Sequence, residues 1–95
     1  MTKDIILNYL ATHKHELQKE YELEQIGLFG SYARDEGRDD SDIDIFVKMK
    51  PNFLKIVGLK YLIEDKFNTR VDIVRLRDKM NKALKNRILK EGIYV

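Results

Sequence analysis

The segment Gly30–Asp44 reads GSYARDEGRDDSDID, and the rest of the chain is best understood as the support for it. It opens with a glycine and a serine and closes with two aspartates, Asp42 and Asp44, separated by one residue. Apolar runs typical of strands lie on both sides, at residues 25–29 and 43–47. Glycine lets a backbone approach a phosphate closely, and hard divalent cations prefer carboxylate oxygens. We therefore predict a phosphate-binding turn joined to a metal-binding carboxylate pair.

Length and composition favour one small domain covering residues 1–95. A chain of 95 residues is long enough for one hydrophobic core but leaves little room for a second, substrate-holding domain. No apolar run approaches the roughly 18 residues of a membrane span, so no membrane association is expected. The chain has no cysteine, which excludes disulfides and thiolate metal sites and favours a cytoplasmic location.

Charge is distributed unevenly along the chain, although the net charge is only +2. Residues 34–44 hold six acids and two bases, so the remainder of the chain is basic. An acidic segment of this kind is most simply a solvated loop. It can also be a cation site whose surroundings attract a polyanion, and composition alone leaves both interpretations open.

Hydrophobic periodicity predicts seven elements in the order helix, strand, short helix, strand, helix, strand, helix. Their expected ranges are 3–19, 25–29, 31–36, 42–48, 53–67, 70–75 and 78–91. Thr2, Ser31 and Asp78 are the expected N-caps, and Gly37 and Gly92 are the expected stops. The pattern indicates an α/β fold with a short sheet of about three strands and the helices packed on one face.

Two aspartates face the same side of the second predicted strand. Side chains two residues apart on a strand point the same way, so Asp42 and Asp44 share one face while Ile43 and Ile45 share the other. Asp72 has the same facing on the next strand. Neighbouring carboxylates repel each other unless a cation lies between them, and three can hold two divalent metals about 3.5–4 Å apart. Asp72 could also accept the proton of an attacking hydroxyl group.

Gly30 and Ser31 are the expected phosphate cradle. Free N–H groups at the start of a helix favour an anion, and the Ser31 hydroxyl can donate to the same oxygen. If the flanking strands are neighbours, a triphosphate could bridge this cradle and the metals. Taken singly, each feature has an ordinary explanation: a surface acid pair, a turn with an N-cap, or an edge-strand charge at Asp72. Their order along the chain favours a nucleotide site.

These motifs resemble the signature of the nucleotidyltransferase superfamily that includes DNA polymerase beta, kanamycin nucleotidyltransferase and poly(A) polymerases. That signature is Gly-Ser, a spacer, Asp-x-Asp, and a third carboxylate on a later strand. Here it stands as Gly30-Ser31, Asp42-Ile43-Asp44 and Asp72. The short length and the ending, Arg87–Val95, narrow the resemblance to the minimal nucleotidyltransferases, the MNT antitoxins encoded beside HEPN-domain toxins. The resemblance implies a small nucleotidyltransferase fold with a short mixed sheet.

Members of this group resemble adenylyltransferases that use ATP and Mg²⁺ to place AMP on a tyrosine of the HEPN ribonuclease, which silences it. The resemblance therefore implies an antitoxin enzyme with ATP as donor, two Mg²⁺ ions as cofactors, and a HEPN toxin as its partner in a hetero-oligomer. The implied site residues are Gly30, Ser31 and Arg34 for the nucleotide, and Asp42, Asp44 and Asp72 for the metals and catalysis. Asp35 stands where the family often has a glycine, which bears on the role of Arg34.

Other functions compete with this one. The chain could neutralise a toxin by binding and occlusion without catalysis, or it could modify a small molecule as antibiotic-type nucleotidyltransferases do. Three intact aspartates favour catalysis, and the absence of an acceptor-binding domain disfavours a small-molecule acceptor. Nucleic acid is not expected as a direct ligand, because the basic residues 70–95 include only one aromatic, Tyr94, and offer no base-stacking platform.

Overall fold

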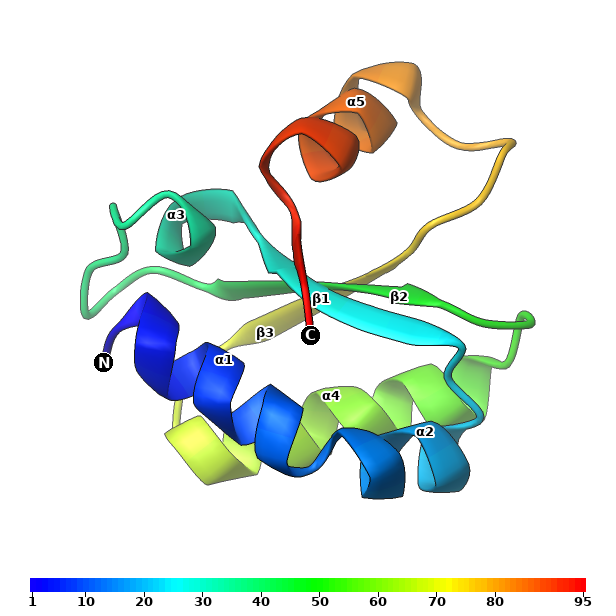
Figure 1. Cartoon of the computed structure of the whole chain (residues 1–95), viewed down its shortest axis with the longest axis horizontal. Helices are drawn as coiled ribbons and strands as arrows, with labels where there is room; N and C mark the ends of the chain where they lie inside the picture. The colour runs from blue at the N-terminus through cyan, green and yellow to red at the C-terminus, as the bar shows by residue number, and fades with distance from the viewer.

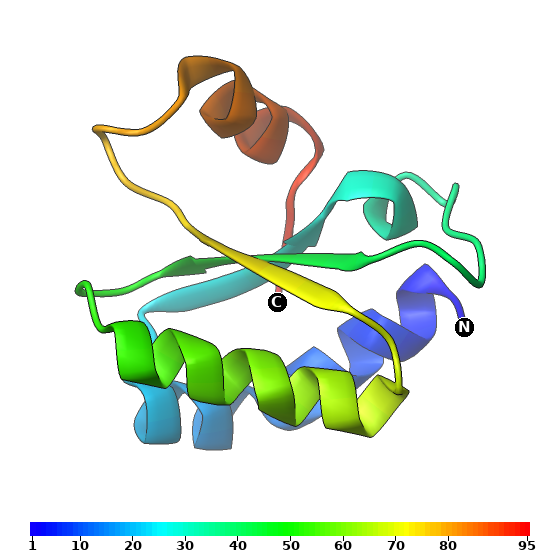
Figure 2. The same cartoon turned by 180° about the vertical axis from the view of Figure 1, so that it is seen from behind.

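The computed structural model describes residues 1–95 and shows a four-stranded sheet with helices on both faces (Figures 1 and 2). The elements are α1 Lys3–Thr12, α2 Lys14–Tyr21, β1 Gln25–Phe29, α3 Gly30–Ala33, β2 Ile43–Lys48, α4 Phe53–Phe67, β3 Val71–Arg75, α5 Lys82–Glu91 and β4 Ile93–Tyr94. The strands lie in the order β3-β2-β1-β4. β1 pairs antiparallel with β2 and β4, whereas β2 and β3 run parallel. The predicted α/β class and mixed sheet are confirmed.

One face of the sheet carries the main hydrophobic core, which α1, α2 and α4 cover (Figure 1). Ile43, Ile45 and Val47 of β2 point into this core and are fully buried, as their alternation predicted. The helices contribute the buried side chains Ile6, Leu10, Leu17, Leu59 and Ile63. Each such side chain stabilises the fold by about 1.5–3 kcal/mol when it leaves water. This core therefore anchors β2, the strand that carries Asp44.

α5 lies on the opposite face of the sheet, so the expectation that all helices pack on one face is wrong (Figures 1 and 2). Ile88 of α5 packs with Phe29 of β1 and Phe46 of β2 in a second buried cluster. Phe46 follows Asp44 by two residues and shares its face of β2. Beyond Asp44 this face of β2 is apolar, so it must be shielded from water. α5 packs over it and buries Phe46.

The fourth strand, β4, was not predicted from the sequence. It contains only two residues, and it pairs with β1 through Gly27 opposite Tyr94 and Leu28 opposite Ile93. A side chain at Gly27 would overlap the Phe46 ring, so the absence of a Cβ there allows that ring to lie across β1. The sheet of about three strands is thereby extended to four, and the end of α5 is tied back to the sheet edge.

Two helix boundaries differ from the prediction. The expected helix over residues 3–19 is interrupted at His13, which has φ −100° and ψ 9° and separates α1 from α2. α5 is capped by Asn81, whose side-chain oxygen accepts a hydrogen bond from the Leu84 N–H at 2.9 Å. Asp78 lies four residues before the first helical residue, too far upstream to act as the cap. No helix of the structure combines the length and apolarity required to cross a membrane.

Candidate active site

The helix that follows β1 is shorter than the sequence predicted. α3 covers only Gly30–Ala33, and Ser31 lies within it rather than capping it. The chain then turns through Asp35, which has a left-handed φ of 60°. Aspartate is among the few non-glycine residues that tolerate this region. Gly37, expected as the stop, instead lies against the ring of Tyr32.

Parallel pairing of β2 with β3 brings two of the predicted carboxylates together. Asp44 lies directly opposite Asp72 in the register of these strands. Asp42 lies one residue before β2 begins, so it falls just outside the strand although the predicted range of 42–48 included it. Asp42 and Asp44 are half-buried, whereas Asp72 is exposed on β3, an edge strand. The carboxylates therefore line one end of the β2–β3 pair, and Asp72 is the most accessible of them.

Electrostatics at Asp44 reflect these neighbours. The pKa of Asp44 is raised from 3.8 to about 6, first by burial and then by the negative charges of Asp72 and Asp42. The positive charges of Arg87 and Arg34 lower it, but by less. The ionised form of Asp44 is therefore disfavoured until a cation offsets the surrounding negative charge.

The donor set of this region suits a hard cation, although it is not a finished ligand cluster. No group of three or more His, Cys, Asp or Glu side chains is arranged so that it could hold a metal ion. The three aspartates nevertheless supply only oxygen donors, which Mg²⁺ prefers. Burial, followed by the negative charges of Asp72 and Asp42, raises the pKa of Asp44. The site thus contains carboxylates that repel one another and that a divalent cation would stabilise.

Gly30 places the predicted phosphate-binding turn against Asp44. It is buried and has a φ of 79°, a left-handed conformation that favours glycine. A Cβ at this position would overlap the Asp44 carboxylate. The neighbouring strands β1 and β2 bring the two residues together, because Phe29 pairs with Asp44 in their register. The cradle residues Gly30 and Ser31 therefore start beside the carboxylates, as the sequence analysis required.

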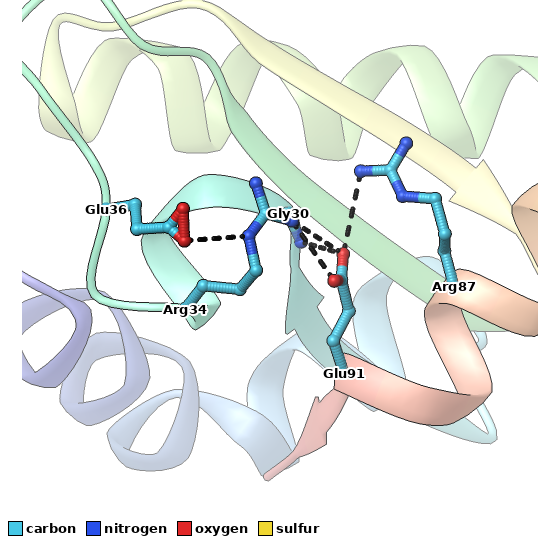
Figure 3. A network of polar contacts seen from close by, with 5 residues as sticks. All are labelled: Gly30, Arg34, Glu36, Arg87 and Glu91. Atoms are coloured by element: carbon cyan, nitrogen blue, oxygen red, sulfur yellow. Dashed lines mark hydrogen bonds and ion pairs between the residues drawn. The ribbon is translucent and has the colours of Figure 1, made fainter.

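Glu91, at the end of α5, is a residue of this region that the sequence analysis missed (Figure 3). Its Oε1 accepts a hydrogen bond from the Gly30 N–H at 3.2 Å. The Arg34 Nη1 donates to both Glu91 carboxylate oxygens, at 3.0 and 3.1 Å. The Arg87 Nη2 lies 3.5 Å from Glu91 Oε1. One carboxylate thus joins the cradle, the predicted nucleotide-binding arginine and α5.

The network explains the ionisation of Glu91. Burial raises its pKa, but hydrogen bonds from Arg34 and Gly30, together with the charges of Arg34 and Arg87, outweigh burial and lower the pKa below its usual value. The only local sign in the sequence was the spacing of Arg87 and Glu91, which are one helical turn apart. That spacing predicts an ion pair on α5, but it contains no information about a contact with Gly30, 61 residues earlier.

The remaining acids of the segment lie outside this cluster. Asp35, Glu36, Asp39 and Asp40 are exposed, which agrees with the interpretation of a solvated loop. Asp35 pairs with Lys3 at 2.9 Å, and Glu36 pairs with the Nε of Arg34 at 3.3 Å. A surface hollow between α2 and α4, lined in part by Tyr21 and Tyr61, contains none of the predicted site residues.

Comparison with known proteins identifies similar sequences along nearly the whole chain. Residues 12–95 match the family model described as polymerase beta, nucleotidyltransferase. The chain is 35% identical over 97 residues to the protein adenylyltransferase MntA of Thermococcus cleftensis, and the match covers 100% of this chain and 97% of that protein.

Solved structures share the fold. A minimal nucleotidyltransferase aligns with a TM-score of 0.80 and 29% identity over 98% of this chain and 95% of that one. A toxin–antitoxin structure with AMP-PNP aligns with a TM-score of 0.72 and 25% identity, and the alignment covers 87% of this chain and 69% of that one. A chain from the structure of the tri-AMPylated Shewanella oneidensis HEPN toxin in complex with MNT antitoxin aligns with a TM-score of 0.62 and 24% identity. The alignment covers 87% of this chain and 66% of that one, and it shows a similar fold.

Proposed function

The chain belongs to the polymerase beta nucleotidyltransferase family, and from that membership we propose that it transfers AMP from ATP to a partner protein. Similarity to a protein adenylyltransferase over the full chain supports a protein as the acceptor. The observation that carries the proposal is the placement of Gly30 against Asp44, which lies opposite Asp72. A turn suited to phosphate and carboxylates suited to metal thus adjoin each other, as nucleotidyl transfer requires.

Each predicted residue has a role in this proposal. Asp42, Asp44 and Asp72 would hold Mg²⁺, and bound there the metal would offset the charge of the phosphates and of these carboxylates. The backbone N–H of Gly30, the hydroxyl of Ser31 and the guanidinium of Arg34 would bind and orient the triphosphate. Arg34 already lies beside Gly30, since both contact Glu91.

The chemical step joins the acceptor to the α-phosphorus of ATP. The tyrosine oxygen forms a bond to the α-phosphorus while the bond from that phosphorus to the bridging oxygen breaks, and pyrophosphate leaves. The phenolic proton goes to a carboxylate oxygen of Asp72. Asp72 suits this role because it is exposed on an edge strand, where the side chain of another protein can reach it.

A HEPN-domain toxin is the proposed partner, in a hetero-oligomer with this chain. Toxin–antitoxin structures among the similar folds support this choice. We infer that residues 1–95 act together as one minimal domain, since α1 and β4, near the two ends, both pack on the central sheet. With ATP as the donor, we propose that the reaction takes place in the cytoplasm.

The test uses the double variant Asp42→Ala/Asp44→Ala with the toxin, Mg²⁺ and ATP. We expect wild type to increase the intact mass of the toxin by AMP units and to silence its ribonuclease activity, and the variant to do neither. The matched control is Asp39→Ala/Asp40→Ala, which removes two exposed acids from the same segment. The control should transfer AMP as wild type does.

Occlusion without catalysis predicts a different result. Large apolar side chains are exposed on α4, including Phe53 at 77% and Leu54 at 79%, and such a surface favours contact with another protein. If the Asp42/Asp44 double variant still silences the toxin and wild type adds no mass, neutralisation occurs by binding alone and the enzymatic proposal is wrong.

A further inference from the structure

We propose that the Glu91 carboxylate holds the place of a phosphate group in the nucleotide site and that the triphosphate displaces it on binding. The inference rests on the proposed function for the identity of the nucleotide. Glu91 thereby competes with any anion for the cradle and lowers the affinity with which that anion binds.

The hydrogen-bond donors carry this inference. The Gly30 N–H has one hydrogen and donates it to Glu91 Oε1 at 3.2 Å. The Arg34 Nη1 is shared between the two oxygens of the same carboxylate. These are the donors that the proposed function assigns to phosphate oxygens. Because one N–H cannot donate fully to two acceptors, a phosphate at Gly30 and the observed Glu91 contact exclude each other.

Burial indicates that Glu91 is directed into the site rather than resting on the surface. Its side chain is 19% exposed, compared with 62% for Glu36, the other acid that pairs with Arg34 (Figure 3). A carboxylate held by an arginine and a backbone N–H has the same recognition chemistry as a phosphate oxygen pair. Its lowered pKa keeps Glu91 anionic at neutral pH, so it competes as a full negative charge.

Charge balance favours exchange over joint occupancy. Asp44 lies opposite Asp72 at this end of the sheet, and Arg34 and Arg87 both pair with Glu91. A triphosphate that entered with Glu91 still in place would share two arginines with four carboxylates. Once Glu91 leaves, Arg87 and the Nη1 of Arg34 can pair with the phosphates, while the Nε of Arg34 keeps its contact with Glu36.

Exchange also has a mechanical consequence at the end of α5. Glu91 is the last residue of α5, and the N–H of the following residue, Gly92, donates to the Ile88 carbonyl at 2.8 Å. Ile88 stays buried against Phe29 and Phe46, so the helix as a whole remains docked. We expect the loss of the Glu91 contacts to loosen only the final turn. Nucleotide binding is thereby communicated to the C-terminal segment.

The experiment measures binding without the toxin, so that no transfer occurs. Wild type, Glu91→Gln and Glu36→Gln are titrated calorimetrically with Mg-ATP and, separately, with Mg-tripolyphosphate. Both variants remove one negative charge near Arg34, but only Glu91→Gln weakens the competitor at Gly30. We expect Glu91→Gln to bind both probes about tenfold more tightly and Glu36→Gln to stay within about twofold of wild type.

A second variant and a second measurement keep the proposal testable even if Glu91→Gln fails to fold. Glu91→Asp keeps the charge but is one methylene shorter, so its contact with Gly30 should weaken and binding should again tighten. Hydrogen exchange at Gly92 should accelerate when Mg-ATP is added to wild type. Equal or weaker binding by folded Glu91→Gln and Glu91→Asp would overturn the inference and make Glu91 a residue that positions Arg34. Tighter tripolyphosphate binding by both variants would support the inference, and if wild type added no AMP to the toxin in the separate intact-mass test, the proposed function would be refuted independently.

Discussion

Gly30 is the single residue on which the geometry of the candidate site depends most directly. Its φ of 79° turns the chain from β1 into α3, and its missing side chain leaves room for the Asp44 carboxylate. Its N–H is also the donor that Glu91 engages. Backbone conformation, space and hydrogen bonding therefore all act at one position, and any side chain would disturb the first two.

Gly30→Ala should reduce both stability and activity. An alanine here combines an unfavourable positive φ with an overlap at Asp44, which we expect to lower the free energy of unfolding by about 1–3 kcal/mol. AMP transfer should be lost. Urea unfolding and intact mass of the toxin measure the two effects.

Gly58→Ala is the matched control, because Gly58 lies inside α4, where alanine favours the helix by up to about 1 kcal/mol. Its new Cβ would lie 3.2 Å from the flexible ring of Tyr21. We expect stability within about 1 kcal/mol of wild type and unchanged transfer. Equal behaviour of the two alanine variants would contradict the role of Gly30.

α5 is the element that connects the core to the candidate site. Its inner side contributes Ile88, 2% exposed, to the cluster with Phe29 and Phe46, while the adjacent Leu89 is 57% exposed. One turn of the same helix also carries Arg87 and Glu91. Hydrophobic packing of α5 therefore determines where this charged pair lies relative to Gly30.

Ile88→Ala should loosen α5 and the Glu91 network together. Removing a buried isoleucine side chain costs about 2 kcal/mol or more, whereas Leu89→Ala, on the exposed side, should cost less than about 0.5 kcal/mol. Urea unfolding measures the difference, and amide exchange over residues 82–92 should accelerate only in Ile88→Ala. Similar losses in the two variants would show that α5 does not depend on this packing.

At the scale of the whole molecule, stability and the candidate chemistry are opposed. Burial of Asp44 on β2 makes its charge costly, and the charges of Asp72 on β3 and of Asp42 just before β2 add to that cost. The pKa of Asp44 in the folded chain is about 6, above its usual 3.8, so the folded state binds more protons than the unfolded state between these values. Stability from this group is therefore present at low pH and declines as the pH rises from about 4 to about 6.

Asp44→Asn should remove that decline. At pH 7.5 we expect the variant to be more stable than wild type by about 1 kcal/mol, a value reduced for solvent screening of a half-buried group, and to have no transfer activity. At pH 4 the difference should largely disappear. Urea unfolding across this range provides the measurement, and added Mg²⁺ should stabilise wild type more than the variant. Lower stability of Asp44→Asn at pH 7.5 would show that the charge of Asp44 is not costly.

The sequence by itself determined the features that depend on local periodicity. The ranges of β1 and α4 agree with the prediction, and the buried Ile43 and Ile45 follow from alternation along β2. The order of Gly-Ser, Asp-x-Asp and a later aspartate was sufficient to predict the family. These features can be predicted from the sequence because the positions of neighbouring residues along a helix or strand determine which way a side chain faces.

Only the tertiary structure decided which face α5 covers, that β4 extends the sheet, and that Glu91 reaches Gly30. An apolar stripe shows that a helix must pack, but not against which surface, because that choice depends on what the other elements leave uncovered. Phe46 made the acid-bearing face the one still open to α5. Glu91 then came within hydrogen-bond distance of a backbone N–H 61 residues away, a contact that no local pattern encodes.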